Sequence, residues 1–371
     1  MIIVDILEEH LEETDFLWNQ RSNALNDPNF TLGRLGELEE RLFAHLDGLI
    51  LGGQEAWKLL EPKLTDGNQS EAFAAASVAL ESEDDGVAAL VCDRLGTAST
   101  SVRAGIQDAF CHASNVRVEP VLRKLLQSDR PSEKSSAIDS FSFRRAALDH
   151  QELKVYLKDN SIEVVRAALL AIARLRVTQL ENDIMPLLRS DNMPLRQEAI
   201  RTGLVVGMES ALDEARQTIR TSPKQADEML ILLGNAGQIK DLPLMIDVVR
   251  EPALARDAIT ALGLLGYSDA MTCLLETVGN PKLARLGGEA IQLITGVNLE
   301  NEGLTRVESG FQRQDDDADL EDDPDEDLPW PDLQALSAWW HTHKPDFDTR
   351  ARYRYGKQYS TAVLLDSLES T

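Results

Sequence analysis

A basic residue recurs at nearly constant spacing through the middle of this chain. The intervals are 31, 32, 30, 60 and 29 residues, and the 60-residue interval is one skipped repeat. Turn-forming residues precede each position, and small or aliphatic residues follow it. A fixed period of this length predicts a solenoid of helix pairs, which offers an extended surface in place of a catalytic pocket. The positions are Arg103, Lys134, Arg166, Arg196, Arg256 and Arg285.

The composition suits thin helical layers. Aromatic residues make up 5% of the 371 residues and apolar residues 43%, with abundant alanine and leucine. A repeat array of this length escapes the limit that splits globular chains into domains, because each unit packs only on its neighbours. We therefore expect an all-α fold, an α-solenoid of helix pairs with atypical N- and C-terminal caps.

The formal net charge is −26. Such a chain repels phosphates, which argues against direct binding of nucleic acid. A basic protein partner is a better match, since opposite charges speed the encounter. The alternative is that the acidity serves solubility alone.

Four regions are expected along the chain. Residues 1–63 carry amphipathic helical patterns outside the repeat register and form an N-terminal helical cap. Residues 64–297 hold the repeat array, and residues 298–328 form an acidic, flexible segment. Residues 329–371 form a C-terminal helical cap that is rich in aromatic residues.

The cap and the repeats show recognisable helix boundaries. Gly52-Gly53 ends the second helix of the N-terminal cap, and a third helix is expected around Ala56–Leu64. The clearest repeat has apolar residues at Val165, Leu169 and Ile172, followed by a second helix near Gln179–Leu188.

A turn carboxylate followed by an aliphatic–arginine pair resembles the HEAT repeat. The resemblance implies a ladder in which the arginine head meets a turn carboxylate of a neighbouring unit while its stem packs on a helix. The structural ladder would then consist of Arg103, Arg166, Arg196, Arg256 and Arg285.

The acidic segment carries ten carboxylates between residues 315 and 327. Two interpretations remain open: direct contact with a partner, or a solvated linker kept extended by repulsion of like charges. The candidate partner-binding residues are Asp315, Asp316, Asp317, Asp319, Glu321, Asp322, Asp323, Asp325, Glu326 and Asp327.

No residue pattern points to an enzyme. The chain has no phosphate loop, no nucleophile elbow and no Cys-x-x-Cys pair, so no catalytic, cofactor-binding or metal-binding residue is expected. His341 and His343 diverge if they lie on a helix, which makes a shared metal improbable. The N-terminus lacks a basic region before an apolar run, and no stretch spans a membrane, so a cytoplasmic location is expected.

Two segments are similar to a bacterial family of HEAT-repeat proteins encoded near type VI secretion genes. The first extends from Phe16 to Trp57, and its most specific part runs from Arg41 to Leu49 and reads Arg-Leu-Phe-Ala-His-Leu-Asp-Gly-Leu. The second combines Leu293–Leu299, the acidic segment, Trp330 and Arg352-Tyr353.

This resemblance implies a role in that secretion system. The first reading is a cytosolic immunity protein that binds and neutralises a toxin, such as a basic nuclease. The carboxylates of the immunity protein would fill the phosphate-binding cleft of that nuclease. The alternative is an accessory scaffold or chaperone that helps load a toxin or spike-tip protein. An enzyme-associated repeat protein such as a bilin lyase is a third possibility, for which we find no specific residues. The oligomeric state and the contact face are left open.

Overall fold

The structure is a computed structural model of the 371-residue chain. It describes residues 4–25, 30–82, 85–113, 115–146, 148–222, 226–306 and 324–370. The chain divides into two compact units, one comprising Met1–Gly207 with Leu368–Thr371 and the other Met208–Ser367. The repeat array expected over residues 64–297 is thus shared between both units.

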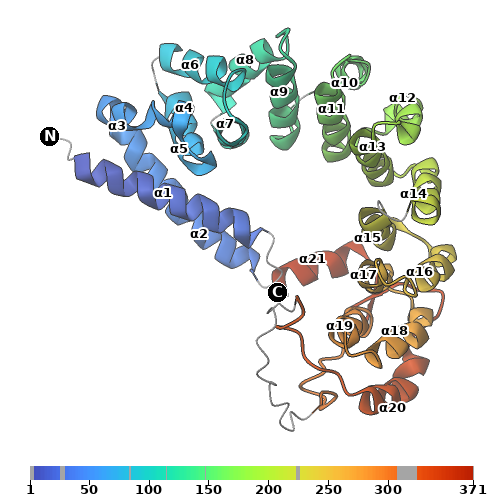
Figure 1. The fold of residues 1–371 in the computed structure, drawn as a ribbon. Helices are drawn as coiled ribbons and strands as arrows, with labels where there is room; N and C mark the ends of the chain where they lie inside the picture. Colours follow the sequence, from blue (N-terminus) through green and yellow to red (C-terminus); the bar gives the residue numbers. More distant parts are fainter. Residues whose placement is uncertain are drawn as a thin grey trace, which may run out of the picture. The chain divides into compact units, whose positions relative to one another are not determined.

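The described residues are almost entirely helical, which confirms the all-α prediction (Figure 1). The exception is a pair of two-residue strands, β1 (Tyr353–Arg354) and β2 (Lys357–Gln358), which form an antiparallel hairpin in unit 2. No helix among the described residues has the length and apolar character that crossing a membrane requires.

Unit 1 begins with a long antiparallel helix pair, α1 (Val4–Ala24) and α2 (Leu32–Leu51). Gly52 caps the C-terminal end of α2 and Gly53 has φ +54°, so the helix ends where the sequence predicted. The expected helix around Ala56–Leu64 is divided into α3 (Gly53–Leu60) and α4 (Lys63–Asp66). Pro62 lies between the two helices and has no backbone N–H to continue the first one.

The remaining helices of unit 1 form two layers. In one layer each helix packs on the next: α5 (Gln69–Glu81), α7 (Thr100–His112), α9 (Pro131–Phe143), α11 (Ile162–Leu175) and α13 (Met193–Val206). The second layer pairs with the first and holds α6 (Asp85–Leu95), α8 (Asn115–Leu125), α10 (His150–Tyr156) and α12 (Glu181–Ile184).

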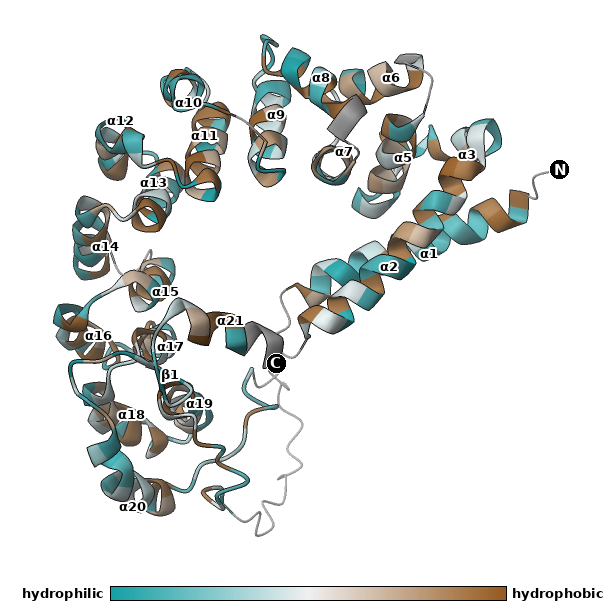
Figure 2. Ribbon diagram, turned by 180° about the vertical axis from the view of Figure 1, so that it is seen from behind, coloured by the Kyte–Doolittle hydropathy of each residue, from teal (hydrophilic) through white to brown (hydrophobic). Residues whose placement is uncertain are grey.

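The helix α11 shows why this pattern folds as it does. Val165, Leu169 and Ile172 are buried, as their helical spacing predicts. The helix expected near Gln179–Leu188 is broken into α12 flanked by two 3-10 turns, since Pro186 removes an intrahelical hydrogen bond. Figure 2 shows that α10 and α12 are mainly hydrophilic, in keeping with a solvent-facing second layer.

Unit 2 repeats the two-layer arrangement. One layer holds α15 (Ala226–Ala236), α17 (Ala255–Leu265) and α19 (Ala284–Thr295), and α14 (Glu209–Thr221), α16 (Leu242–Val248) and α18 (Met271–Val278) pack on it. The helix α20 (Leu333–His343) packs on α18, β1 packs on α19, and α21 (Thr361–Ser370) is the last helix. Short 3-10 turns precede α16 and α18, at Ile239–Asp241 and Ser268–Ala270.

A prediction follows from the close approach of α5 and α7. A Cβ atom on Gly105 would lie 2.1 Å from the carbonyl oxygen of Gln69 and 2.7 Å from the amide nitrogen of Phe73. Because both are backbone atoms, Gly105→Ala forces the helices apart and is expected to lower the free energy of unfolding by about 1–3 kcal/mol. Urea titration followed by circular dichroism measures the change.

Gly36→Ala is the matched control, since nothing lies within 4 Å of a Cβ atom at that position of α2. Alanine there is expected to raise stability by about 0.5–1 kcal/mol. If the two variants unfold at the same urea concentration, the close backbone contact at Gly105 does not limit the packing.

Candidate functional site

An open groove of about 370 Å³ crosses one face of unit 1. Its walls come from four consecutive helices of one layer, α7, α9, α11 and α13. Its lining combines small side chains with longer polar and charged ones. The lining residues are Thr100, Arg103, Ala104, Gln107, Ser135, Ser136, Asp139, Glu163, Arg166, Ala167, Leu170 and Glu198.

A hydrogen-bond network fixes one wall of the groove. The side-chain amide of Gln107 reaches from α7 to α9 and donates to Asp139 Oδ2 at 2.9 Å and to the carbonyl oxygen of Ser136 at 3.1 Å. Arg174 from α11 donates to the other carboxylate oxygen of Asp139. The charge of Asp139 is therefore already paired within the fold.

Three groove residues keep buried polar atoms without a hydrogen-bond partner among the described residues. They are Arg103 Nε, a donor, and Gln107 Oε1 and Glu198 Oε1, both acceptors. A buried polar atom that lacks a partner costs about 1–3 kcal/mol, so each such atom needs an explanation.

Among the described residues of unit 1, an ion pair of the kind expected for the ladder is seen at Lys134, a basic residue of the same repeat period. Lys134 Nζ lies 3.2 Å from Asp159 Oδ2, so a basic residue on α9 meets the turn carboxylate before α11. The backbone N–H of Ser161, and then the Lys134 ammonium, lower the pKa of Asp159. Asp159 is therefore poised to stay ionised against the basic residue.

Arg103 and Arg166 differ from this arrangement among the described residues. Arg103 donates only to the carbonyl oxygen of Ala98 in its own turn, at 3.4 Å. Arg196 is half-buried on α13. Arg166 is exposed, and no carboxylate among the described residues forms an ion pair with it. The ladder contact expected for Arg166 is therefore absent among the described residues, and its side chain lines the groove.

In unit 2 the ladder residue Arg256 binds Asp325, a member of the acidic segment. The pair is bidentate, with Nη2–Oδ1 and Nη1–Oδ2 distances of 2.6 and 2.8 Å. Arg285 donates to the backbone carbonyl oxygen of Asp325 at 2.8 Å and lies over the ring of Trp330, 4.6 Å from its centroid. Two consecutive ladder arginines therefore hold the chain from Asp325 to Trp330.

This arrangement changes the interpretation of the acidic segment. The Asp325 side chain is only 7% exposed, so it is a structural partner of Arg256 and not a free contact for another protein. Glu326 and Asp327 are exposed. The remaining candidates, together with the flexibility expected for most of the segment, lie outside the described residues: Asp315, Asp316, Asp317, Asp319, Glu321, Asp322 and Asp323.

A backbone bridge pairs the two chain segments on either side of the acidic residues. Thr305 and Pro331 form an antiparallel bridge, flanked by a 2.9 Å hydrogen bond from the N–H of Arg306 to the Trp330 carbonyl oxygen. The N–H of Asp332 donates to the Leu304 carbonyl oxygen at 2.7 Å. Residues 304–306 therefore lie beside residues 330–332.

The Arg352-Tyr353 motif joins the C-terminal ends of neighbouring helices in unit 2. Arg352 Nε donates to the carbonyl oxygen of Leu265 at 2.9 Å, and Nη2 donates to that of Gly234 at 3.2 Å. These carbonyls end α17 and α15, where a cation is favoured by the helix dipole. Burial lowers the pKa of Arg352. The Tyr353 N–H donates to the Gly266 carbonyl oxygen at 2.7 Å.

The Arg41–Leu49 segment is also used for helix packing. His45 Nδ1 lies 3.1 Å from His10 Nδ1 across the α1–α2 pair. A Cβ atom on Gly48 would lie 2.6 Å from the His10 ring, so alanine at this position would force that ring to shift. Both segments that resemble the bacterial family therefore contribute to the packing of helices.

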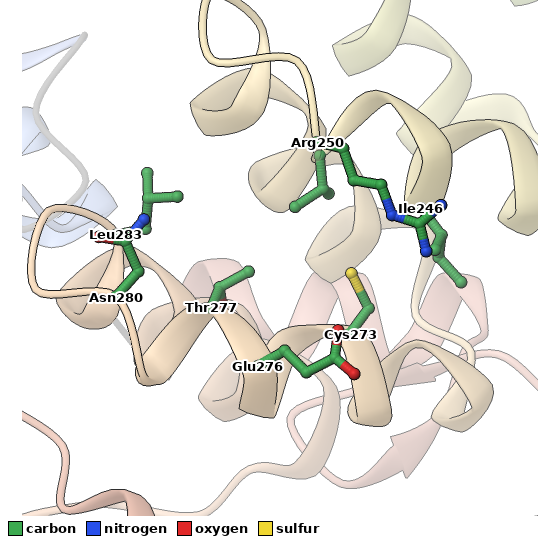
Figure 3. A pocket seen from close by; sticks show the side chains of 8 residues that line it. Ile246, Arg250, Cys273, Glu276, Thr277, Asn280 and Leu283 are labelled. Carbon is green, nitrogen blue, oxygen red and sulfur yellow. The ribbon is translucent and has the colours of Figure 1, made fainter.

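A smaller cavity of about 200 Å³ lies between α16 and α18 of unit 2 (Figure 3). Arg250, Cys273 and Glu276 line it. All three cysteines are free thiols, and burial raises the pKa of each, to about 11 for Cys92 and about 12 for Cys111. Raised thiol pKa values mean inert cysteines at neutral pH. No group of three metal-ligating side chains gathers anywhere in the described ranges.

Comparisons with known proteins give no family assignment. No protein-family profile and no curated protein matches the chain. Among solved structures, human deoxyhypusine hydroxylase in complex with glycerol is 18% identical, over 75% of this chain and 94% of that chain, with a TM-score of 0.25. A TM-score this low supports no inference about fold or activity.

Of the groove residues, sequence reasoning singled out only Arg103 and Arg166, and it missed Gln107, Ser136 and Glu198 among others. A usable signal was present, because Gln107 follows Arg103 by one helical turn and so shares its face. The serine-rich helix at 131–143 was a second signal, since small polar side chains on an inner helix leave room above them. Neither signal shows which polar atoms lack a partner.

A prediction follows from the Arg256–Asp325 pair. Asp325→Asn removes the charge from a buried bidentate contact, and we expect the free energy of unfolding of unit 2 to fall by about 1–3 kcal/mol. Asp327→Asn, at an exposed position nearby, is the matched control and is expected to change it by less than about 0.5 kcal/mol. Urea denaturation of the full chain compares the two; equal midpoints would show that Asp325 is not a structural residue.

Proposed function

We propose that the protein is a non-catalytic α-solenoid of HEAT-like repeats that binds a protein toxin of a type VI secretion system and neutralises it in the cytoplasm of the producing cell. The observation that carries this proposal is the location of the two family-like segments. Arg41–Leu49 and Arg352-Tyr353 pack helix against helix, so they serve the fold and supply no reactive group. The groove across four helices is an open surface suited to a macromolecular partner.

Charge supports a basic partner. The chain carries a net charge of −26. A basic nuclease has a cleft that binds phosphates, and carboxylates of a partner protein can occupy the same cleft. The contact proposed for the acidic segment involves Asp315–Asp323 with the exposed Glu326 and Asp327. Asp325 is excluded from it, because that side chain is paired with Arg256.

Co-expression with the toxin encoded by the adjacent gene tests this function. Cells that produce the toxin together with the full-length protein are expected to survive, and cells that produce the toxin alone are expected to die, because binding blocks the toxin before it acts. Viable counts after induction measure the difference. Equal killing with and without the protein would contradict the immunity function. If the toxin is exported only when the protein is present, and the protein gives no protection, the accessory loader is favoured instead.

A second experiment tests the acidic segment. Asp315, Asp316, Asp317 and Asp319 are changed together to asparagine while Asp325 is retained. We expect the affinity for the toxin to fall by about tenfold, a loss of about 1.4 kcal/mol. Titration calorimetry at low salt measures it, because surface charges are screened at higher ionic strength.

The control removes the same amount of charge from another surface. Asp5, Glu8, Glu9 and Glu12 are exposed on α1 and are changed to the corresponding amides. This variant is expected to bind as the parent does. If both variants lose affinity equally, the effect comes from overall charge, and if neither loses affinity, the segment is a solvated linker.

A further inference from the structure

We infer that His10 on α1 and His45 on α2 bind a transition metal ion between the two helices, with one imidazole nitrogen of each residue as a ligand. The site lies in the N-terminal helix pair of unit 1 and shares no residue with the groove across α7, α9, α11 and α13. This goes beyond the proposed function, because the ligand is a small cation and no other protein takes part.

The geometry of the two rings carries the inference. His10 Nδ1 and His45 Nδ1 lie 3.1 Å apart across the helix pair, although the residues are 35 positions apart in the sequence. The ring centroids are 5.2 Å apart and the ring planes meet at 69°. Zn²⁺ binds imidazole nitrogen at about 2.0–2.1 Å, so two such nitrogens in a tetrahedral arrangement lie about 3.3–3.4 Å apart. The rings need to separate by only about 0.2–0.3 Å to admit the ion.

The packing of the helix pair holds the His10 ring in this position. A Cβ atom on Gly48 would lie 2.6 Å from His10 Nε2, so the ring already rests against α2 at this glycine. Gly48 follows His45 by three residues, and residues at this spacing share one face of a helix. The His10 ring is therefore placed by one residue of α2 while its Nδ1 atom meets the other.

The ligand atoms select the kind of ion. Imidazole suits Zn²⁺, Cu²⁺ and Ni²⁺, whereas Mg²⁺ and Ca²⁺ prefer oxygen ligands. No third His, Cys, Asp or Glu of the described residues joins the pair, so water fills the remaining positions of the ion. Both histidines are half-buried, which leaves a path from solvent. An ion that binds the folded chain in preference to the unfolded one stabilises it, so this ion would hold α1 against α2.

Calorimetric titration of the untagged full-length protein with ZnCl₂ tests the site. We expect one ion to bind per chain and the midpoint of thermal unfolding to rise when it binds. MgCl₂ is expected to produce neither effect, which separates the histidine pair from the acidic surface of the chain. With one equivalent of Cu²⁺ in place of Zn²⁺, the electron paramagnetic resonance spectrum is expected to show coupling to two imidazole nitrogens.

His45→Gln removes one ligand but keeps a polar side chain, and it is expected to abolish both the binding of Zn²⁺ and the rise in the unfolding midpoint. His10→Gln makes the same test from α1 if that variant does not fold. His150→Gln, at an exposed position of α10, is the matched control and is expected to bind Zn²⁺ as the parent does.

Gly48→Ala keeps both ligands but displaces the His10 ring, so it is expected to weaken the binding of Zn²⁺. The inference is overturned if Zn²⁺ does not bind, if His45→Gln and His150→Gln bind it alike, or if the Cu²⁺ spectrum shows oxygen ligands alone. No toxin is used, so the result is independent of the immunity test.

Discussion

Close approach of helix backbones is the constraint on which both units depend. A Cβ atom on Gly105 would meet the backbone of α5, and one on Gly234 would lie 2.8 Å from the Ala261 carbonyl oxygen. Gly263 faces the Cα atom of Ala290 in the same way, at 3.1 Å. Layers built at this distance have no room for long side chains between the helices. Arginine side chains near these contacts therefore extend to the helix ends and the open face.

Arginines at the helix ends then tie successive pairs together. In unit 1, Arg144 donates to the carbonyl oxygens of Phe110 and Ala113, at 3.0 and 2.6 Å, where α7 ends. In unit 2, Arg352 does the same for α15 and α17. These carbonyls lack helical partners, and a cation beside them is favoured by the helix dipole. The same device appears in both units although neither arginine lies in the ladder register.

The sequence predicted the helical class, because the spacing of Val165, Leu169 and Ile172 and the break at Gly52-Gly53 depend on local chemistry alone. It did not predict the division of the chain at Gly207 or the pairing of Asp325 with Arg256. Those two residues are 69 positions apart, and no periodic pattern specifies which carboxylate reaches an arginine from that distance. The β1–β2 hairpin was missed for a similar reason, since it is stabilised by hydrogen bonds to α17 and α19.

The basic residue at the ladder position therefore plays different roles in different repeats. Its role depends on whether a carboxylate lies close enough to form an ion pair with it. Lys134 finds Asp159 in the following turn, and Arg256 finds Asp325 from a distant segment. The turn before α13 offers Asp191, which is exposed and forms no ion pair with Arg166 among the described residues. A row of residues that elsewhere holds the fold together thus leaves one guanidinium free, beside three buried polar atoms that also lack partners. An arginine without an ion-pair partner is available for binding at the surface, while the period of the repeats stays the same.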